Sequence, residues 1–281
     1  MSQINKPSEY FNTLLYTATG VQSVTGAGFQ PDMSWVKARS TTSSHYIADV
    51  VRGSTKTIKP NSTDAEGTQD LITSFDSDGV TLGSSNWSDS RTAVIWNWLA
   101  GGTASSNTDG SITSSVSANT TSGFSIVSYT GTGANATVGH GLGVAPKMVI
   151  FKNRDNGTQE WDTYHAGLTD ATYFIQLNST NAQNNTNGAV RFNSTAPTSS
   201  ATGGDWIIND NKRNTFNVVD KYLFADQSAA EGTADILDFL STGFKFRRGD
   251  STTNSSGATY IYMAFAENPL VGTNNIPATA R

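Results

Sequence analysis

The chain has 281 residues, of which 15% are charged, and a net charge of −5. Low charge with many β-branched and aromatic residues does not suit a disordered chain, and the lack of any run of more than two adjacent Lys or Arg residues disfavours a nucleic-acid partner. The absence of cysteine excludes disulfides and thiolate zinc sites, and without a signal core or a run of about twenty apolar residues we expect cytoplasmic assembly and no membrane insertion.

The first part of the chain predicts short strands joined by polar turns. Residues 1–11 form an N-terminal arm, and residues 12–102 form a first β-sandwich unit whose apolar stretches are bounded by turn residues. Near the end of this unit, Val94, Trp96 and Trp98 alternate with other residues. Since alternate side chains of a strand share one face, these three residues predict a buried face.

The rest of the chain predicts a linker and a second, longer unit. Residues 103–122, rich in Ser, Thr, Asn and Gly, indicate a linker with one strand at 111–116. Residues 123–268 form a second β-sandwich unit with an insertion near 169–226, and residues 269–281 form a C-terminal arm. Short apolar stretches between turn residues predict strands in this unit at 124–129, 148–151, 173–177 and 243–246.

One segment, residues 229–240, has helical spacing. Ile236, Leu237 and Leu240 would share one face of a helix there, so we expect a single turn or a short helix. The corresponding stretch of the first unit, residues 69–75, is shorter.

The two units repeat one another. Gly, Pro, Met, Lys and Arg recur at identical spacing in residues 28–39 and 143–154. Three further blocks recur in the same order, pairing 16–20 with 129–133, 65–68 with 230–233, and 94–98 with 261–265. We therefore expect an all-β fold of two tandem, duplicated antiparallel β-sandwich domains of the jelly-roll or concanavalin-like kind.

Aromatic residues in polar loops are the candidate ligand-binding residues. Trp87 lies between Asn86 and Asp89, and Trp161 and Trp206 also have acidic or amide neighbours. Lectins hold sugars by stacking them on an exposed ring while nearby Asn and Asp side chains bind the hydroxyls. The alternative is that these rings fill a contact between units or subunits.

No catalytic site is predicted. The three histidines, His45, His140 and His165, lack the setting of a nucleophile, base and orienting carboxylate that hydrolysis requires. Glu66 and Glu231 recur in both units and could form the carboxylate pair of a glycosidase, but a structural hydrogen bond explains them equally well.

A metal site and a cofactor are not expected. Calcium binds several loop oxygens, and the first unit offers candidate carboxylates. They do not form the full cation-loop pattern. The carboxylates considered are Asp64, Glu66, Asp76, Asp78 and Asp89.

Several blocks resemble repeats of marine bacteriophage virion proteins. They are Gly-Phe-Gln-Pro-Asp-x-x-Trp-Val-Lys from Gly28, Thr-Ser-Phe-Asp-Ser-Asp-Gly from Thr73, Gly-His-Gly-Leu-Gly-Val-Ala-Pro-Lys-Met from Gly139, and the stretch 260–269. This repeat family is similar to lectin-like, concanavalin-type sandwiches of tail fibres and other virion appendages, and it supplies no catalytic motif.

The resemblance implies a non-enzymatic structural protein of the virion. A tail fibre or appendage component that binds host surface glycan is the first expectation. The alternatives are a capsid-decoration or head-fibre protein that serves assembly, and a glycan-cleaving depolymerase. The expected partners are other virion proteins and further copies of this chain in a closed homo-oligomer.

Overall fold

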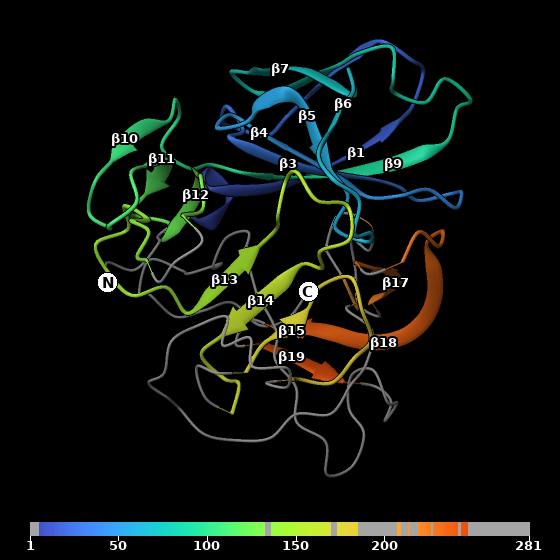
Figure 1. Cartoon of the computed structure of the whole chain (residues 1–281). Helices are drawn as coiled ribbons and strands as arrows, with labels where there is room; N and C mark the ends of the chain where they lie inside the picture. The colour runs from blue at the N-terminus through green and yellow to red at the C-terminus, as the bar shows by residue number, and fades with distance from the viewer. Residues whose placement is uncertain are drawn as a thin grey trace, which may run out of the picture.

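The computed structural model describes residues 6–132, 136–169, 173–184, 207–208, 213, 219–225, 227–240 and 243–246. Within these ranges the regular structure consists of one short 3-10 helix, η1 (Pro7–Glu9), and strands whose named pairs are all antiparallel (Figure 1). The predicted all-β fold is confirmed.

The first half of the chain forms a sandwich of two sheets. A six-stranded sheet has the order β1-β9-β3-β4-β5-β6, and a three-stranded sheet has the order β2-β8-β7. Buried side chains from both sheets, including Leu14, Val36, Val80 and Ile95, form the core between them. The strands of this half are β1 (Phe11–Thr17), β2 (Gln22–Thr25), β3 (Met33–Ala38), β4 (Tyr46–Asp49), β5 (Gly53–Ile58), β6 (Gly67–Thr68), β7 (Ile72–Asp76), β8 (Gly79–Leu82) and β9 (Thr92–Trp98).

The outer face of the six-stranded sheet is covered by the second half of the chain. Val94 and Trp96 are buried there, and Trp98 packs at the edge of the same cluster, so the face predicted to be buried is confirmed. The residues that cover it from the second half are Trp161, Leu177, Leu223 and Ala225. Because both faces of this sheet are buried, its central strands β3 and β9 are almost continuously buried rather than alternating.

Most of the second half lies below the first in Figure 1, and its described residues include sheets of three and four strands. The predicted strands at 124–129, 148–151 and 243–246 are confirmed, whereas only two residues of 173–177 form a strand. The strands are β12 (Phe124–Tyr129), β13 (Met148–Phe151), β14 (Asp162–His165), β15 (Ile175–Gln176), β16 (Ile207–Ile208), β17 (Val219–Phe224), β18 (Gly232–Leu240) and β19 (Gly243–Phe246).

The stretch 103–122 holds two strands instead of the single one expected. β10 (Ser105–Asn107) and β11 (Ser114–Asn119) form a three-stranded sheet with β12 of the second half. The Asp109–Gly110 turn lies between β10 and β11, and Val116 pairs with Val127. This stretch is therefore part of a sheet and not a free linker.

The expected helix in residues 229–240 is wrong, because most of this segment forms β18. Its backbone pairs with β17 on one side and with β19 on the other. Pairing on both sides outweighs the helical spacing of three apolar residues, since strand preference depends strongly on tertiary context. The corresponding segment of the first half also ends in a strand, β7.

Several repeated positions make the same contacts in both halves. Gly28 and Gly143 both have positive φ, at 81° and 69°. Lys56 donates to Thr68 over 2.7 Å, and Lys221 donates to Thr233 over 3.0 Å. The correspondence thus reaches back to Lys221, inside the segment 169–226 that we expected to be an insertion. The counterpart of β9, residues 261–265, lies outside the described residues, so a complete second sandwich stays a prediction.

Candidate functional site

Trp87 lies in the loop that joins β8 to β9, and the neighbouring Asn86 fixes this loop. The Asn86 side chain is 4% exposed, its Nδ2 donates to the Gly20 carbonyl over 2.6 Å, and its Oδ1 accepts from the Tyr16 hydroxyl at 3.2 Å. The backbone N–H of Gly20 in turn donates to the Trp87 carbonyl over 2.9 Å. This corrects the expectation that the Asn86 amide faces a ligand, because its hydrogen-bonding groups hold the loop together.

The Trp87 ring is half-buried and stands beside a charged pair. Its inner part packs against the sandwich core, with the Tyr46 ring centroid 6.3 Å away. The Arg91 guanidinium carbon lies 5.1 Å from the Trp87 ring centroid, and Arg91 Nε donates to Asp89 over 2.7 Å. Hydrogen bonds from Arg91 lower the pKa of the exposed Asp89 carboxyl to about 2. The loop therefore presents a half-buried aromatic ring, a cation and an ionised acceptor together.

The start of the same loop is held by Asp70. The carboxylate of Asp70 accepts from the backbone N–H groups of Ser84 at 3.1 Å and Ser85 at 2.9 Å. Hydrogen bonds from these two serines lower the pKa of Asp70 to about 2. On the adjoining loop Val21 is 69% exposed. Trp87, Asp89, Arg91 and Val21 are named the tip site below.

Trp161 does not belong to a ligand-binding surface. Its side chain is only 4% exposed, and its Nε1 donates to the carbonyls of Lys59 at 3.0 Å and Ser62 at 3.1 Å. It lies in the cluster between the two halves. The expected exposed ring is thus wrong for Trp161, and the alternative of a contact between units describes it. Trp206 lies outside the described residues.

Glu66 and Glu231 are bound by arginines of the opposite half. Arg154 Nε and Nη2 each donate to Glu66 over 2.9 Å, and Arg39 Nε and Nη2 each donate to Glu231 over 2.8 Å. The backbones of the same residues are also paired. The Glu66 N–H donates to the Arg154 carbonyl, and the Glu231 N–H donates to the Arg39 carbonyl, each over 2.7 Å.

A second arginine from the same half reaches each of these carboxylates. Arg52 Nη1 lies 3.1 Å from Glu66, and Arg213 Nη1 lies 3.4 Å from Glu231. Burial opposes ionisation of Glu66, but hydrogen bonds from Arg154 and Arg52 outweigh it and hold the pKa of Glu66 below its usual value. The set is named the cross-brace below and comprises Arg39, Arg52, Glu66, Arg154, Arg213 and Glu231.

His45 is a buried structural residue at the boundary between the halves. Its Nδ1 accepts from Trp35 Nε1 at 2.8 Å, which places the proton on Nε2, and Nε2 donates to the carbonyls of Phe224 at 2.9 Å and Gln227 at 3.1 Å. Burial and the nearby Lys37 lower the pKa of His45 to about 3. His165 Nδ1 accepts from the Gly167 backbone N–H at 3.0 Å, and burial lowers its pKa.

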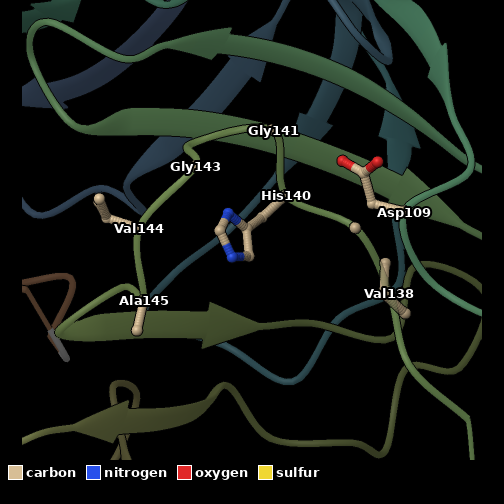
Figure 2. A pocket seen from close by; sticks show the side chains of 8 residues that line it. Asp109, Val138, His140, Gly141, Gly143, Val144 and Ala145 are labelled. Atoms are coloured by element: carbon tan, nitrogen blue, oxygen red, sulfur yellow. The ribbon is translucent and has the colours of Figure 1, made fainter.

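His140 lies in an open pocket of about 460 Å³ that sequence reasoning did not single out. Its ring points into the space between Val138 and Val144, and Asp109 stands at the rim (Figure 2). The glycine-rich run from Gly139 was the sequence signal for this pocket.

The loop carboxylates considered for calcium are not gathered into one site. Each has its own partner: Asp64 pairs with Lys59, Asp76 binds Ser74 and Thr81, Asp78 binds Gly26 and Gly28, and Asp89 pairs with Arg91. Within the described residues, no three His, Asp or Glu side chains are placed to hold a metal ion together. The same residues include no helix with the length and apolar character of a membrane span.

Comparison with protein families places the chain in one of them. Residues 6–205 and 199–269 match the family model described as Domain of unknown function (DUF7483). The chain belongs to the DUF7483 family. Together the two matched ranges cover both halves of this DUF7483 chain. No curated protein and no solved structure matches it.

Proposed function

We propose that the chain is a non-enzymatic structural protein of a bacteriophage particle, an appendage component that binds host surface glycan through the tip site. The observation that carries the proposal is the half-buried Trp87 ring beside the Arg91–Asp89 pair. The resemblance of the glycine-rich and Trp-Val-Lys blocks to virion repeats supports the proposed location on a bacteriophage particle. Glu66 and Glu231 are occupied by arginines, so they offer no free carboxylate pair for hydrolysis.

The tip site has the groups that a saccharide needs. The solvent-exposed part of the Trp87 ring contacts the C–H groups of a sugar, Arg91 donates hydrogen bonds and Asp89 accepts them from hydroxyl groups. The loop is fixed by Asn86 and Asp70, so binding costs little ordering entropy. Each site is weak, and several copies on one particle raise the overall affinity.

The test is binding of the full chain to arrayed host-surface glycans, followed by titration of the best glycan. Trp87→Ala should weaken binding about tenfold, the order expected when one well-packed aromatic contact is lost. Tyr129→Ala is the matched control, because Tyr129 is 42% exposed on a different sheet. Asp89→Asn, at an exposed position, provides a second variant that leaves the core intact.

Equal affinity of the wild type, Trp87→Ala and Asp89→Asn would contradict the tip site. Thermal melting of each variant separates lost binding from lost folding, since Trp87 also contacts the core.

Capsid decoration is the second candidate function, and the cross-brace favours it. Two reciprocal bidentate ion pairs and a shared apolar cluster fix the two halves to each other. Such bracing suits a protein that reinforces a particle. Binding of the purified chain to assembled heads, without binding to glycans, would favour decoration over the appendage.

A further inference from the structure

The two halves carry the same glycine turn. Residues 24–31 form the first glycine loop, and residues 139–146 form the second, aligned through the repeated Gly and Pro positions. Gly26 and Gly28 have φ values of 103° and 81°, and Gly141 and Gly143 have φ values of 70° and 69°. Alternating left-handed glycines turn nearby backbone N–H groups toward one side, and such concave N–H arrays bind anionic oxygens.

In the first glycine loop these N–H groups bind a carboxylate of the chain itself. Asp78 Oδ1 accepts from the Gly28 N–H at 2.6 Å, and Asp78 Oδ2 accepts from the Gly26 N–H at 3.1 Å. Asp78 comes directly before Gly79 at the hairpin between β7 and β8. The first half therefore fills its own carboxylate site.

The second glycine loop lacks this carboxylate. The residue that precedes Gly243, the counterpart of Gly79, is Thr242 in the sequence. Among the described residues, the N–H groups of Gly141 and Gly143 have no hydrogen-bond acceptor. Both glycines line the open pocket. In the first half, by contrast, Asp78 accepts hydrogen bonds from the equivalent N–H groups.

His140 adds a donor to this pocket. Its Nδ1 accepts from the Leu142 N–H at 3.2 Å, so the proton is on Nε2. Figure 2 shows the ring directed into the pocket between the Gly143–Val144 side and the Val138 side. The counterpart of His140 in the first glycine loop is Thr25.

Asp109 provides an acceptor on the other side of the pocket. It lies across from Val144 and Ala145 (Figure 2), and its Oδ2 accepts from Asn107 Nδ2 at 2.8 Å. The side chain is exposed, so water screens its charge from an anion at the glycine loop. Its remaining oxygen can accept from a hydroxyl group.

We infer that this pocket binds a carboxylate-bearing monosaccharide unit, such as a uronic acid. The ligand carboxylate takes the place that Asp78 has in the first half, on the N–H groups of the second glycine loop and on His140 Nε2. A sugar hydroxyl donates to Asp109, and Val138 and Val144 contact the ring C–H groups. The volume of about 460 Å³ is within the usual range of small-ligand pockets. The inference rests on the proposed function, because it adds a second saccharide site with a defined chemical class.

The test uses the full chain with glucuronate, methyl glucoside and acetate at constant ionic strength, followed by saturation-transfer NMR and calorimetry. Glucuronate should bind saturably, and the neutral glucoside should bind about tenfold more weakly, the usual effect of losing charge-assisted hydrogen bonds. His140→Ala should weaken glucuronate binding, and Thr25→Ala, the matched position of the first half, should leave it unchanged. Asp109→Asn should weaken glucuronate less than His140→Ala, since it alters only a hydroxyl contact.

The inference would be overturned if glucuronate does not bind or if methyl glucoside binds equally well. Equal binding of acetate would also overturn it, because the site would then be one for a bare carboxylate. Glucuronate binding that Trp87→Ala abolishes and His140→Ala leaves intact would also overturn it while the proposed function stands. Glucuronate binding that His140→Ala weakens and Trp87→Ala leaves intact supports the pocket independently of the tip site.

Discussion

At the residue scale, His45 makes contacts between the halves that depend on pH. The ring links Trp35 of its own half to the Phe224 and Gln227 carbonyls of the other half. The neutral form is required, because Nδ1 must accept a hydrogen bond while Nε2 donates. Because the folded chain holds His45 in its neutral form, protonation of His45 is coupled to unfolding.

His45 should make stability fall as the pH drops. Its pKa is about 3 in the folded chain and 6.5 ordinarily, so the unfolded state binds a proton first. The His45 contribution is fully present above pH 6.5 and is lost as the pH falls toward 3. At pH 5 the loss is about 2 kcal/mol, from about 1.4 kcal/mol per pH unit. Denaturant titrations between pH 7.5 and pH 4.5 measure this dependence.

The matched variants are His45→Gln and His165→Gln. His45→Gln should flatten the pH dependence of the free energy of unfolding, and His165→Gln should change it less, because His165 is only partly buried. Identical slopes for the wild type and His45→Gln would contradict the role of His45.

Sequence alone could not separate Trp161 from Trp87. Both have polar neighbours along the chain, and both were expected to be exposed. The difference is the Lys59–Ser62 segment, about a hundred residues away, whose carbonyls accept from Trp161 Nε1. The expectation that Asn86 faces a ligand failed for the same reason, because its hydrogen-bond partners Tyr16 and Gly20 are distant in sequence.

At the element scale, the cross-brace makes two connections between the halves. Arg39, directly after β3, binds Glu231, directly before β18. Arg154, shortly after β13, binds Glu66, directly before β6.

Glu66 is 12% exposed, Arg52 is 6% exposed and Arg154 is 39% exposed. A largely buried carboxylate that is shared by two arginines gives little net stability relative to an apolar pair. Its removal, however, takes away the ion-pair partner of Arg154 and leaves Arg52 with Asp49 alone.

Glu66→Gln should therefore destabilise the chain by about 3 kcal/mol, the lower end of the range for breaking a buried ion pair. Glu231→Gln should have a similar effect, because Glu231 has the same contacts in the other half. Chemical denaturation at neutral pH measures both. The control is Glu9→Gln, whose pair with Lys6 is more than half exposed and contributes well under 1 kcal/mol. Equal effects of all three substitutions would contradict the cross-brace.

The sequence predicted the strand at 94–98 of the first half and the repetition of Lys, Arg and Glu, since alternation and spacing are visible in a sequence. It did not predict that each Arg pairs with the Glu of the opposite half. The helix expected at 229–240 failed because pairing with β17 and β19 is not encoded in local spacing.

At the scale of the whole molecule, one apolar cluster belongs to both halves. Trp35, Val94 and Trp96 from the first half pack against Trp161 and Leu223 from the second. Neither half can bury its share of this cluster alone. The six-stranded sheet is consequently the central layer, between the three-stranded sheet of the first half and the second half of the chain.

The two halves should unfold in a single transition. Trp96→Ala should lower the midpoint without splitting the transition and should cost about 3 kcal/mol or more, as for other large-to-small core changes. Differential scanning calorimetry of both proteins checks this. Two separate transitions in the wild type would show that the halves are energetically independent.

The measurement that tests the proposed function most directly is electron microscopy of purified phage particles labelled with a gold-conjugated antibody against this chain. If the chain is a glycan-binding appendage, the label lies on the outside of the particle, at the tail or its fibres, and host adsorption falls when Trp87→Ala replaces the wild type. Label confined to the head surface would support decoration instead. Particles that carry no label, with the chain found only in the soluble lysate, would contradict a role in the virion.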